Sequence, residues 1–535
     1  MAPTANGFGD PSRWVLPAVL AQQARDRPDA PWVETTDGER CTFGQAWADA
    51  RQVAGWFAQM GVQPGDRVAL MMLGHLDFVR AWMGLGWLGA TVVLLNTELH
   101  GAFLEHQLRN CEARIAVVDQ GFAATVEAAS EDVATLQHLV VRSAGDAAPG
   151  RLPQTAWSGW SSATPFNGPP PAAQQIACVM YTSGTSGPAK GVLMPHAHCT
   201  LYGLGAIKAL QLTEGDRYYI TLPLFHANGL LMQLGATLLA GIPAIVRTRF
   251  SASAWLGDVR RYRATVTNLL GSTAAFIFSQ PAGEDDSHHS LRAVCSAPNL
   301  PAHEALFHGR FGIADVVSGF GMTEVNIPVW GRLGHPRPGA GGWTHGDWFE
   351  VIVADPETDA ELPRGGTGEI LVRPKVPFGF MAGYLGMPER TVEAWRNLWF
   401  HTGDAGTMDD SGLLTFVDRI KDCIRRRGEN ISATEVEMLV AAIDGVAEVA
   451  AYAVPSGIPG CEDELMLAIV PHPGTQLVLD EVIARADAVL PRFARPGFVR
   501  VLEQLPKTAT GKVQRAVLRK EGAGQAWQRP DRSPA

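Results

Sequence analysis

Residues 181–192 read YTSGTSGPAKGV, and this stretch decides which fold the sequence predicts. It follows an apolar run at residues 176–180, so we expect a strand that ends in a loop. Glycine lets backbone N–H groups approach an anion closely, hydroxyl side chains add donors, and Lys190 adds a positive charge. The stretch therefore predicts a phosphate-binding loop. It differs from a Walker A loop because Gly191, rather than Ser or Thr, follows Lys190.

Chain length and net charge limit the classes of protein to which this sequence can belong. The chain has 535 residues and a formal net charge of -10, with a sequence pI near 5.8. Domains usually hold roughly 100 to 200 residues, so more than one domain is expected. Lys and Arg are spread thinly, which argues against a nucleic-acid surface. A flexible Ser/Gly linker would resemble the loop in composition, so further motifs must decide between the two interpretations.

The sequence also predicts a compartment. The seven cysteines form no CxxC pair and no regular framework, which favours a reducing cytoplasm. The first ten residues lack the basic and apolar regions of a signal peptide. The most apolar stretch, residues 229–246, is interrupted by Gln233, Gly241 and Pro243, so it predicts a buried helix followed by a strand. We therefore expect a cytoplasmic protein without a membrane span.

Apolar and amphipathic segments alternate in the N-terminal part. Strands are predicted at residues 67–72, 91–95 and 114–118, with helices at 77–88 and 102–111 between them. This alternation is typical of βαβ units in a parallel sheet. The Pro-, Gly- and Ser-rich residues 144–173 predict a surface connection. The expected fold is α/β, with a large domain of mixed, mostly parallel sheets and helices at residues 13–418.

A smaller α+β domain is expected at residues 423–520. Helices are predicted at 434–443 and 479–490, and strands at 449–454 and 464–470. Residues 419–422 would form a hinge between the domains. Residues 1–12 and 521–535 are expected to be disordered.

Further motifs follow the loop in a fixed order: PLFHANG at 223–229, GFGMTE at 319–324, GE at 368–369 with GY at 383–384, WFHTGD at 399–404, DR at 418–419, and Pro506 with TGK at 510–512. In this order they resemble the AMP-forming adenylating enzymes, which include acyl-CoA synthetases, stand-alone adenylation domains and firefly luciferase. The resemblance covers residues 40–520. NTEL at 96–99 and the 223–228 segment most resemble bacterial ligases of the carnitine, crotonobetaine and medium-chain type.

The resemblance implies an ATP site. Phe320 stands where the family usually has tyrosine, and its ring would stack on adenine, which does not require the phenol. Asp404 and Arg419 would bind the ribose hydroxyls. The loop would hold the β- and γ-phosphates. The implied nucleotide-binding residues are Thr182, Ser183, Gly184, Thr185, Ser186, Gly187, Lys190, Ala297, Pro298, Gly319, Phe320, Gly321, Met322, Asp404 and Arg419.

Adenylation brings two anions together, so its catalysis is mostly charge neutralisation and alignment. By resemblance, Glu324 and Thr185 would hold Mg²⁺, and Thr323 would contact the α-phosphate. Lys512 would bridge the substrate carboxylate and the α-phosphate as negative charge develops. Each residue also has an ordinary interpretation: Lys512 as a surface lysine, and Thr323 with Glu324 as the start of a helix.

The resemblance also implies a second half-reaction. The small domain would be mobile and rotate about Lys421, which would remove Lys512 from the site. Gly428, Glu429 and Asn430 would then line the site of coenzyme A (CoA), and Arg425, Arg426 and Arg427 could meet the CoA phosphates. His226 would separate the acyl pocket from the pantetheine tunnel. A core histidine is the alternative interpretation of His226.

Two other runs allow a metal interpretation, DDSHH at 285–289 and HAHC at 196–199, but neither has a known ligand spacing. A polar surface loop explains the first run and the start of a helix explains the second. Three features depart from the family pattern. Pro188 stands one place earlier than usual, Arg427 replaces a frequent glycine, and Phe320 replaces tyrosine. The shifted proline leaves the position of Lys190 open.

We therefore expect an AMP-forming acyl-CoA synthetase. A carboxylic acid and ATP would give acyl-AMP and pyrophosphate, and CoA would then give the thioester and AMP. One alternative is an acyl-AMP ligase or stand-alone adenylation enzyme that loads a carrier-protein phosphopantetheine, and another is a non-catalytic nucleotide-binding regulator. The acyl pocket would come from residues 226–230, 269–275, 295–299 and 325–328, which permit a bulky hydrophobic acid. The resemblance leaves a homodimer open.

Overall fold

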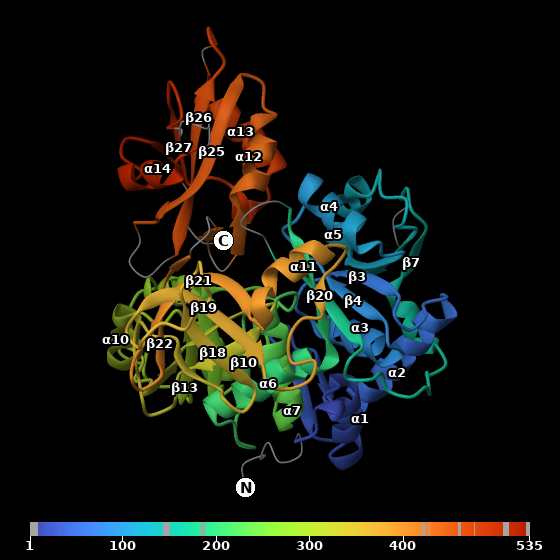
Figure 1. Ribbon diagram of the computed structural model, residues 1–535. Coiled ribbons are helices and arrows are strands. Elements are labelled where there is room, and N and C mark those ends of the chain that lie inside the picture. The colour runs from blue at the N-terminus through green and yellow to red at the C-terminus, as the bar shows by residue number, and fades with distance from the viewer. Residues whose placement is uncertain are drawn as a thin grey trace.

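The computed structural model describes residues 9–142, 150–182, 188–419, 423–426, 429–457, 462–475, 477–506 and 513–530. Residues up to 419 form a large body, and those from 423 onward form a smaller domain above it in orange and red (Figure 1).

The predicted alternation of strands and helices builds an eight-stranded sheet in the order β20-β9-β8-β4-β3-β5-β6-β7. Its strands are parallel from β8 to β7, and β9 and β20 are antiparallel. Helices cover both faces, so its central strands are continuous apolar runs. The elements are β3 (Arg67–Met71), α3 (Leu76–Leu88), β4 (Thr91–Leu94), α4 (Gly101–Cys111), β5 (Ile115–Asp119), α5 (Gln120–Ala129), β6 (His138–Arg142), β7 (Gln154–Ala156), β8 (Ile176–Thr182), β9 (Lys190–Pro195) and β20 (Gly383–Tyr384).

Residues 150–173 are more regular than predicted. The expected surface connection contains β7, which pairs with β6 at the edge of the sheet, and η3 (Trp157–Ser162). Trp157 is buried and makes an edge contact with Trp56, with ring centroids 5.8 Å apart. Burial of this large aromatic ring outweighs the turn-forming composition around it. Residues 143–149 lie outside the described residues.

The second sheet has seven strands in the order β14-β13-β12-β10-β11-β1-β2. All neighbours are parallel except β1 and β2. A single hydrophobic core joins one face of this sheet to one face of the first through the helices between them. The elements are η2 (Pro11–Arg13), α1 (Leu16–Asp26), β1 (Pro31–Thr35), β2 (Arg40–Thr42), α2 (Phe43–Gln59), α6 (His196–Leu210), β10 (Tyr218–Ile220), the π-helix η4 (Asn228–Leu234), α7 (Gly235–Ala240), β11 (Ala244–Val246), α8 (Ala252–Arg261), β12 (Val266–Leu270), α9 (Gly271–Phe278), β13 (Ala293–Ala297), α10 (Pro301–Gly309) and β14 (Asp315–Val317).

Local signals determine where the helices begin and end. Before α2, the Thr42 side chain accepts the Gln45 N–H, and the Gln45 side chain accepts the Thr42 N–H. This reciprocal pair satisfies two backbone donors that the helix leaves open. Helix α3 ends at Gly89, whose φ of +83° is accessible to glycine without strain. Residues 229–246 form the buried helix and strand that the sequence predicted, as η4, α7 and β11.

The third sheet is antiparallel, in the order β15-β16-β17-β22-β21-β19-β18. Its elements are β15 (Gly319–Met322), β16 (Asn326–Trp330), β17 (Gly342–Thr344), β18 (Phe349–Ala354), β19 (Thr367–Pro374), α11 (Pro388–Ala394), η5 (Arg396–Leu398), β21 (Phe400–Met408) and β22 (Leu413–Arg419). The predicted fold class, an α/β large domain of mixed, mostly parallel sheets with a smaller α+β domain, is confirmed. Most of the antiparallel strand pairs of the large domain belong to this third sheet.

The small domain contains a two-stranded and a four-stranded sheet. Apolar residues of α12 and β24 join the same hydrophobic cluster as α4 and α5 of the large domain. The elements are β23 (Cys423–Arg426), β24 (Glu429–Ser432), α12 (Ala433–Ala441), β25 (Val446–Pro455), β26 (Asp463–Pro471), α13 (Leu479–Val489), η6 (Arg492–Ala494), β27 (Phe498–Val501), α14 (Arg515–Glu521) and β28 (Trp527–Gln528).

Both expected disordered ends are wrong where the structure describes them. At the C-terminus, Val499 pairs with Trp527 in the β27–β28 ladder, and the Arg529 guanidinium donates two bonds of 2.7 Å to Asp487. A strand pairing and a bidentate ion pair fix a segment whose composition alone predicted a tail. At the N-terminus, the Asp10 side chain caps η2. Residues 1–8 and 531–535 lie outside the described residues.

Among the described residues, none of the helices combines the length and the apolar composition needed to cross a bilayer.

Candidate active site

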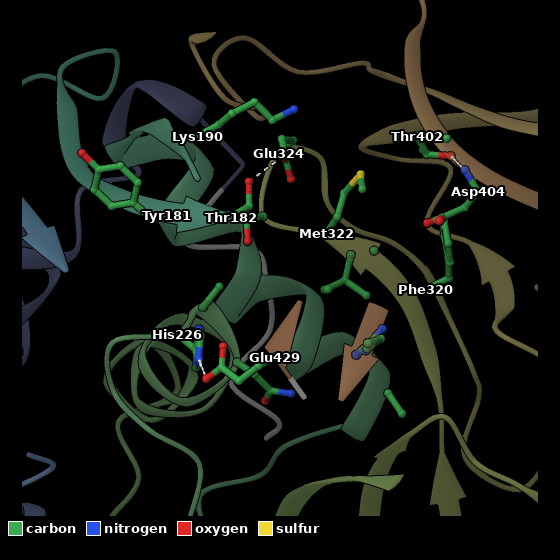
Figure 2. Close-up of a pocket in the computed structure, with 18 of the residues that line it drawn as sticks. Tyr181, Thr182, Lys190, His226, Phe320, Met322, Glu324, Thr402, Asp404 and Glu429 are labelled. Atoms are coloured by element: carbon green, nitrogen blue, oxygen red, sulfur yellow. Dashed lines mark hydrogen bonds and ion pairs between the residues drawn. The ribbon is translucent and has the colours of Figure 1, made fainter. Parts of the chain in front are cut away.

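A cavity of about 1280 Å³ opens where the three sheets of the large domain meet the small domain. Its wall comes from β8 and β9, the 222–232 segment, β13, the β15–β16 turn and β21, and from β23, β24 and α12 of the small domain. Strands far apart in sequence therefore contribute to one space (Figure 2).

Many residues that the sequence predicted for the site line this cavity: Thr182, Lys190, His226, Ala297, Pro298, Gly319, Phe320, Gly321, Met322, Thr323, Glu324, Asp404 and Glu429. Of Arg419 and Asn430 the structure describes the backbone only. Arg419 pairs with Asp404 between β22 and β21, and Asn430 pairs with Arg425 between β24 and β23. Ser183, Gly184, Thr185, Ser186, Gly187, Lys421, Arg427, Gly428 and Lys512 lie outside the described residues.

Glu324 is held at the end of the predicted phosphate loop. Its Oε1 accepts bonds from Thr182 Oγ1 at 3.1 Å and from the Tyr384 hydroxyl at 3.0 Å, and its side chain is buried. Lys190 lies opposite Thr182 in the β8–β9 ladder, with Nζ 4.2 Å from the Tyr384 ring centroid. Despite the shifted Pro188, Lys190 therefore faces the cavity beside Glu324 (Figure 2).

Tyr384 is a site residue to which the sequence analysis assigned no role. Burial and the nearby Glu324 carboxylate raise the pKa of Tyr384 well above its ordinary value, so it stays a neutral donor. The only sequence signal was its place in the Gly383-Tyr384 motif.

Helix α6 supports the turn that carries Thr323 and Glu324. His198 Nε2 lies 2.9 Å from the Thr323 carbonyl oxygen, and the Tyr202 hydroxyl donates to the Met322 carbonyl at 3.0 Å. Asn326, with a φ of +70°, donates its side-chain amide to the His198 carbonyl at 3.0 Å. Burial lowers the pKa of His198, and its two carbonyl contacts offset part of that effect. The 196–199 run thus begins a helix, as its ordinary interpretation predicted.

The nucleoside side of the cavity is aromatic and acidic. The rings of Phe320 and Phe416 lie nearly parallel, with centroids 6.3 Å apart and an interplanar angle of 27°. The Asp404 carboxylate is buried, and its backbone N–H donates to Thr402 Oγ1 at 3.1 Å. Glu369 Oε1 accepts the Gly403 N–H at 2.9 Å, which fixes the backbone just before Asp404. A planar base and a hydroxylated sugar fit these groups.

Glu429 of the small domain reaches into the large domain. Its Oε1 lies 2.9 Å from His226 Nε2 and accepts the Asn96 side-chain amide at 2.9 Å. Burial alone lowers the pKa of His226, but the Glu429 carboxylate and, to a lesser extent, Glu98 together raise it more, so the pKa lies above the ordinary histidine value. His226 is therefore coupled to the small domain rather than enclosed as a core histidine.

Glu435, in the first turn of α12, makes a second contact between the domains. Its Oε1 accepts the backbone N–H of Ala189 at 3.0 Å, next to Lys190. Burial raises the pKa of Glu435 to about 7, although the Ala189 bond opposes the shift. Glu435 lies in the helix that the sequence predicted at residues 434–443, but no role in the site was predicted for it. No local signal placed it at the phosphate loop, because the contact joins residues 246 positions apart.

The remaining part of the cavity is mostly apolar. Each of the four ranges expected for the acyl pocket contributes lining residues to it, among them Asn228, Leu270, Cys295 and Ile327. Burial raises the pKa of the Cys295 thiol to about 12, so this side chain is neutral. The other apolar lining residues here are Leu222, Phe225, Met232 and Trp330.

The donor set beside the loop fits a hard divalent cation. Glu324 presents a carboxylate whose Oε1 is already oriented by two hydroxyl donors, and Thr323 lies next to it in the cavity wall. Carboxylate and hydroxyl oxygens are the ligands that Mg²⁺ prefers. Thr185, the other predicted ligand, lies outside the described residues.

Comparisons with known proteins agree with this geometry. The AMP-binding enzyme family matches residues 20–385, and the AMP-binding enzyme C-terminal domain matches residues 435–512. The crotonobetaine/carnitine–CoA ligase of Citrobacter koseri is 30% identical over 87% of this chain and 90% of that protein. The sulfoacetate–CoA ligase of Cupriavidus necator is 31% identical over 94% and 97%. The structure of o-succinylbenzoate CoA synthetase from Bacillus subtilis shares the fold, with a TM-score of 0.80, 23% identity and coverage of 96% and 99%.

The family match spans more than half of the chain, and the CoA ligases align with nearly all of it. The chain therefore belongs to the AMP-binding enzyme family, and within it to the AMP-forming acid–thiol ligases.

Proposed function

We propose that the protein activates a hydrophobic carboxylic acid with ATP and Mg²⁺ and transfers the acyl group to CoA, in the cytoplasm. The observation that carries this proposal is the single cavity in which Lys190 and Glu324, the buried Asp404, an apolar compartment and Glu429 of the small domain all meet. A phosphate chain, a nucleoside, an acyl chain and a thiol can reach one another only in such a shared space.

In the first half-reaction, a carboxylate oxygen attacks the α-phosphorus, and the bond from that phosphorus to the bridging oxygen breaks. Pyrophosphate leaves, and acyl-AMP remains. Lys190 supplies positive charge to the phosphates and the Thr323 hydroxyl a donor, while the Thr182 hydroxyl orients Glu324. Glu324 would hold Mg²⁺, which when bound reduces the negative charge of the triphosphate. We assign Lys512 to the carboxylate and the α-phosphate, where charge develops.

In the second half-reaction, the CoA thiol gives up its proton to solvent and the sulfur attacks the acyl carbonyl carbon. The bond from that carbon to the phosphate oxygen breaks, and AMP leaves. We assign His226 to the junction between the acyl compartment and the thiol path, with Glu429 holding its ring. Of the residues that flank the Lys512 segment, neither Pro506 nor Val513 lines the cavity. Val513 packs instead on the cluster around Tyr452, inside the small domain. This placement supports rotation of the small domain about Lys421, with the described arrangement serving the thiol step.

One set of assays tests the proposal. Pyrophosphate release is measured with ATP, Mg²⁺ and a panel of aliphatic and aromatic acids, and thioester formation is then measured with free CoA or a phosphopantetheinyl carrier protein. Saturable turnover with CoA supports the proposal. Turnover with the carrier protein alone identifies an adenylation enzyme that loads carriers. A nucleotide-binding regulator would release no pyrophosphate with any acid.

A further inference from the structure

Asn228 is a polar side chain in the largely apolar compartment, and hydrogen bonds from the protein interior fix its orientation. Asn228 begins the π-helix η4, and such irregular helices recur at functional sites. The next residue, Gly229, packs so closely on the 222–223 segment that a Cβ would overlap the Pro223 carbonyl oxygen. The backbone that carries Asn228 is therefore held in one position against the cavity wall.

A buried chain of hydrogen bonds begins at Tyr218. Tyr218 is fully buried, and its hydroxyl lies 2.6 Å from Asn268 Oδ1. A buried hydroxyl hydrogen needs an acceptor, and Asn268 is the one partner of this hydroxyl within the described part of the chain. The Asn268 carbonyl therefore faces Tyr218. Its amide nitrogen faces Asn228, and donates to Asn228 Oδ1 at 2.8 Å.

Gln233 completes the arrangement one turn further along η4. Its side-chain amide donates to the same Asn228 Oδ1 at 3.2 Å, and Gln233 is fully buried. The Asn228 carbonyl oxygen thus accepts two bonds from the protein interior. The amide nitrogen of Asn228 points the other way, and its two N–H groups donate to no described residue.

The surroundings decide what this donor can bind. The compartment is otherwise lined mostly by apolar residues and the neutral Cys295 thiol. The other polar side chains from these ranges are His226, which is already paired with the Glu429 carboxylate, and Asn299, whose amide already donates to Glu304. The described lysine and arginine residues that line the cavity come from β9, α11, η5 and β23, not from the elements around Asn228, and are Lys190, Arg390, Arg396 and Arg425. A second carboxylate or a sulfonate at this point would therefore be buried without a counter-ion of its own, because Glu429 already pairs with His226. A neutral oxygen that accepts a hydrogen bond fits both the donor and its surroundings.

We infer that the acid taken by this ligase carries a neutral oxygen acceptor, such as an ether, carbonyl or hydroxyl oxygen, on a hydrophobic acyl part, and that Asn228 donates to it. Asn228 is the specificity-determining residue, and Tyr218, Asn268 and Gln233 position its amide. This inference rests on the proposed function, because it names the class of acid that the same site activates.

Isosteric pairs of acids test the inference with the full-length enzyme. Decanoate is compared with oxadecanoates, in which an ether oxygen replaces one methylene at successive positions, and ethylbenzoates are compared with methoxybenzoates. An ether oxygen accepts a hydrogen bond but cannot donate one. A purely apolar pocket would favour the hydrocarbon, because the ether oxygen would lose its hydrogen bond to water on binding and gain none from the protein. For at least one ether position, we expect kcat/KM for pyrophosphate release to exceed that of the hydrocarbon by about tenfold.

Two adjacent tyrosines provide a matched pair of variants. Tyr218→Phe removes the hydroxyl that orients Asn268, whereas Tyr219→Phe removes a hydroxyl that donates to Asp258 at 2.7 Å and packs in a different core cluster. Both changes delete one buried hydroxyl from the same strand. Tyr218→Phe is expected to reduce the preference for the ether several-fold, and Tyr219→Phe to leave it unchanged. Asn228→Leu should abolish the preference.

The outcomes separate this inference from the proposed function. If the wild-type enzyme turns over the acids but prefers the hydrocarbon at every position, or if Asn228→Leu keeps the preference for the ether, the inference is overturned and the ligase activity stands. If no acid supports pyrophosphate release, the proposed function is overturned and the inference with it. An ether preference that Tyr218→Phe lowers and Tyr219→Phe preserves supports both.

Discussion

His226 Nε2 of the large domain lies 2.9 Å from Glu429 Oε1 of the small domain. Through this contact, the position of the small domain affects the protonation of a histidine at the edge of the acyl compartment. Because the same carboxylate oxygen also accepts the Asn96 amide, the small domain is held by two donors at one point. This hydrogen bond forms only when the two domains are docked as described, so the pKa of His226 depends on the position of the small domain.

Glu429→Gln should slow thioester formation from supplied acyl-AMP and CoA by about tenfold, because a charge-assisted contact between the domains is lost. The pKa of His226 should also fall, since burial lowers it and the Glu429 carboxylate no longer opposes that effect. The pH profile of the thiol step and the His226 NMR titration measure the two effects. Glu481→Gln, at an exposed position of α13, serves as the control. An unchanged His226 titration would contradict the coupling.

Glu435→Gln should change how the thiol step depends on pH. Burial raises the pKa of Glu435 to about 7 from a reference of 4.5, so docking of α12 takes up a proton. Docking is therefore strongest below pH 4.5, weakens as the pH rises toward 7, and stays weak above it. Gln keeps an oxygen for the Ala189 N–H but never ionises. The ratio of variant to wild-type kcat/KM for acyl-AMP should be near one below pH 4.5, rise with pH between 4.5 and 7, and level off above about pH 7.5.

Taking this ratio removes the pH dependence of the CoA thiol, which is common to both enzymes. A ratio that stays constant between pH 5.5 and 8 would show that Glu435 does not control docking.

Tyr384→Phe removes a hydroxyl that donates to Glu324 at 3.0 Å but keeps the ring under Lys190. We expect pyrophosphate release to fall by about tenfold, with a higher KM for MgATP, because the carboxylate loses one of the donors that orient it. Thioester formation from supplied acyl-AMP should be spared. Tyr262→Phe, remote from the cavity lining, is the matched control. Equal loss in both half-reactions would point to a general structural defect instead.

Lys512→Ala should lower acyl-AMP formation by about a hundredfold or more, because a positive charge is removed from the place where negative charge develops. It should leave thioester formation from supplied acyl-AMP nearly unchanged, since the proposed rotation removes the lysine before the thiol arrives. Separate assays of the two half-reactions check this. Equal loss of both would contradict the assignment.

Trp527→Ala should destabilise the small domain by about 1–2 kcal/mol. Trp527 pairs with Val499 in the β27–β28 ladder, and the Arg529 guanidinium lies 5.5 Å from its ring centroid. Urea unfolding followed by hydrogen exchange of the small-domain amides measures the effect, because Trp527 is the only tryptophan of that domain and fluorescence would be lost with it. Gln525→Ala, exposed two residues earlier, provides the reference. If the two variants unfold alike, the segment contributes no stability.

The amino-acid sequence by itself determined the elements and the family. The alternation at residues 67–118 predicted β3, α3, β4, α4 and β5 to within two residues at each end, because buried parallel strands must be continuously apolar. The loop, GFGMTE and WFHTGD motifs predicted residues that do line one cavity. The polar composition of the C-terminal segment predicted disorder, and this prediction is wrong because one strand pairing and one ion pair hold the segment in place.

Only the tertiary structure decided which side chains hold the site residues. Tyr384 against Glu324, Glu429 against His226 and Glu435 against Ala189 join residues 60 to 246 positions apart. No local pattern encodes such contacts, because they depend on how sheets and domains pack rather than on the spacing of residues along the chain. The same holds for Asn228: the sequence shows an asparagine, and the folded chain alone determines that its carbonyl faces inward and its amide faces the acyl compartment.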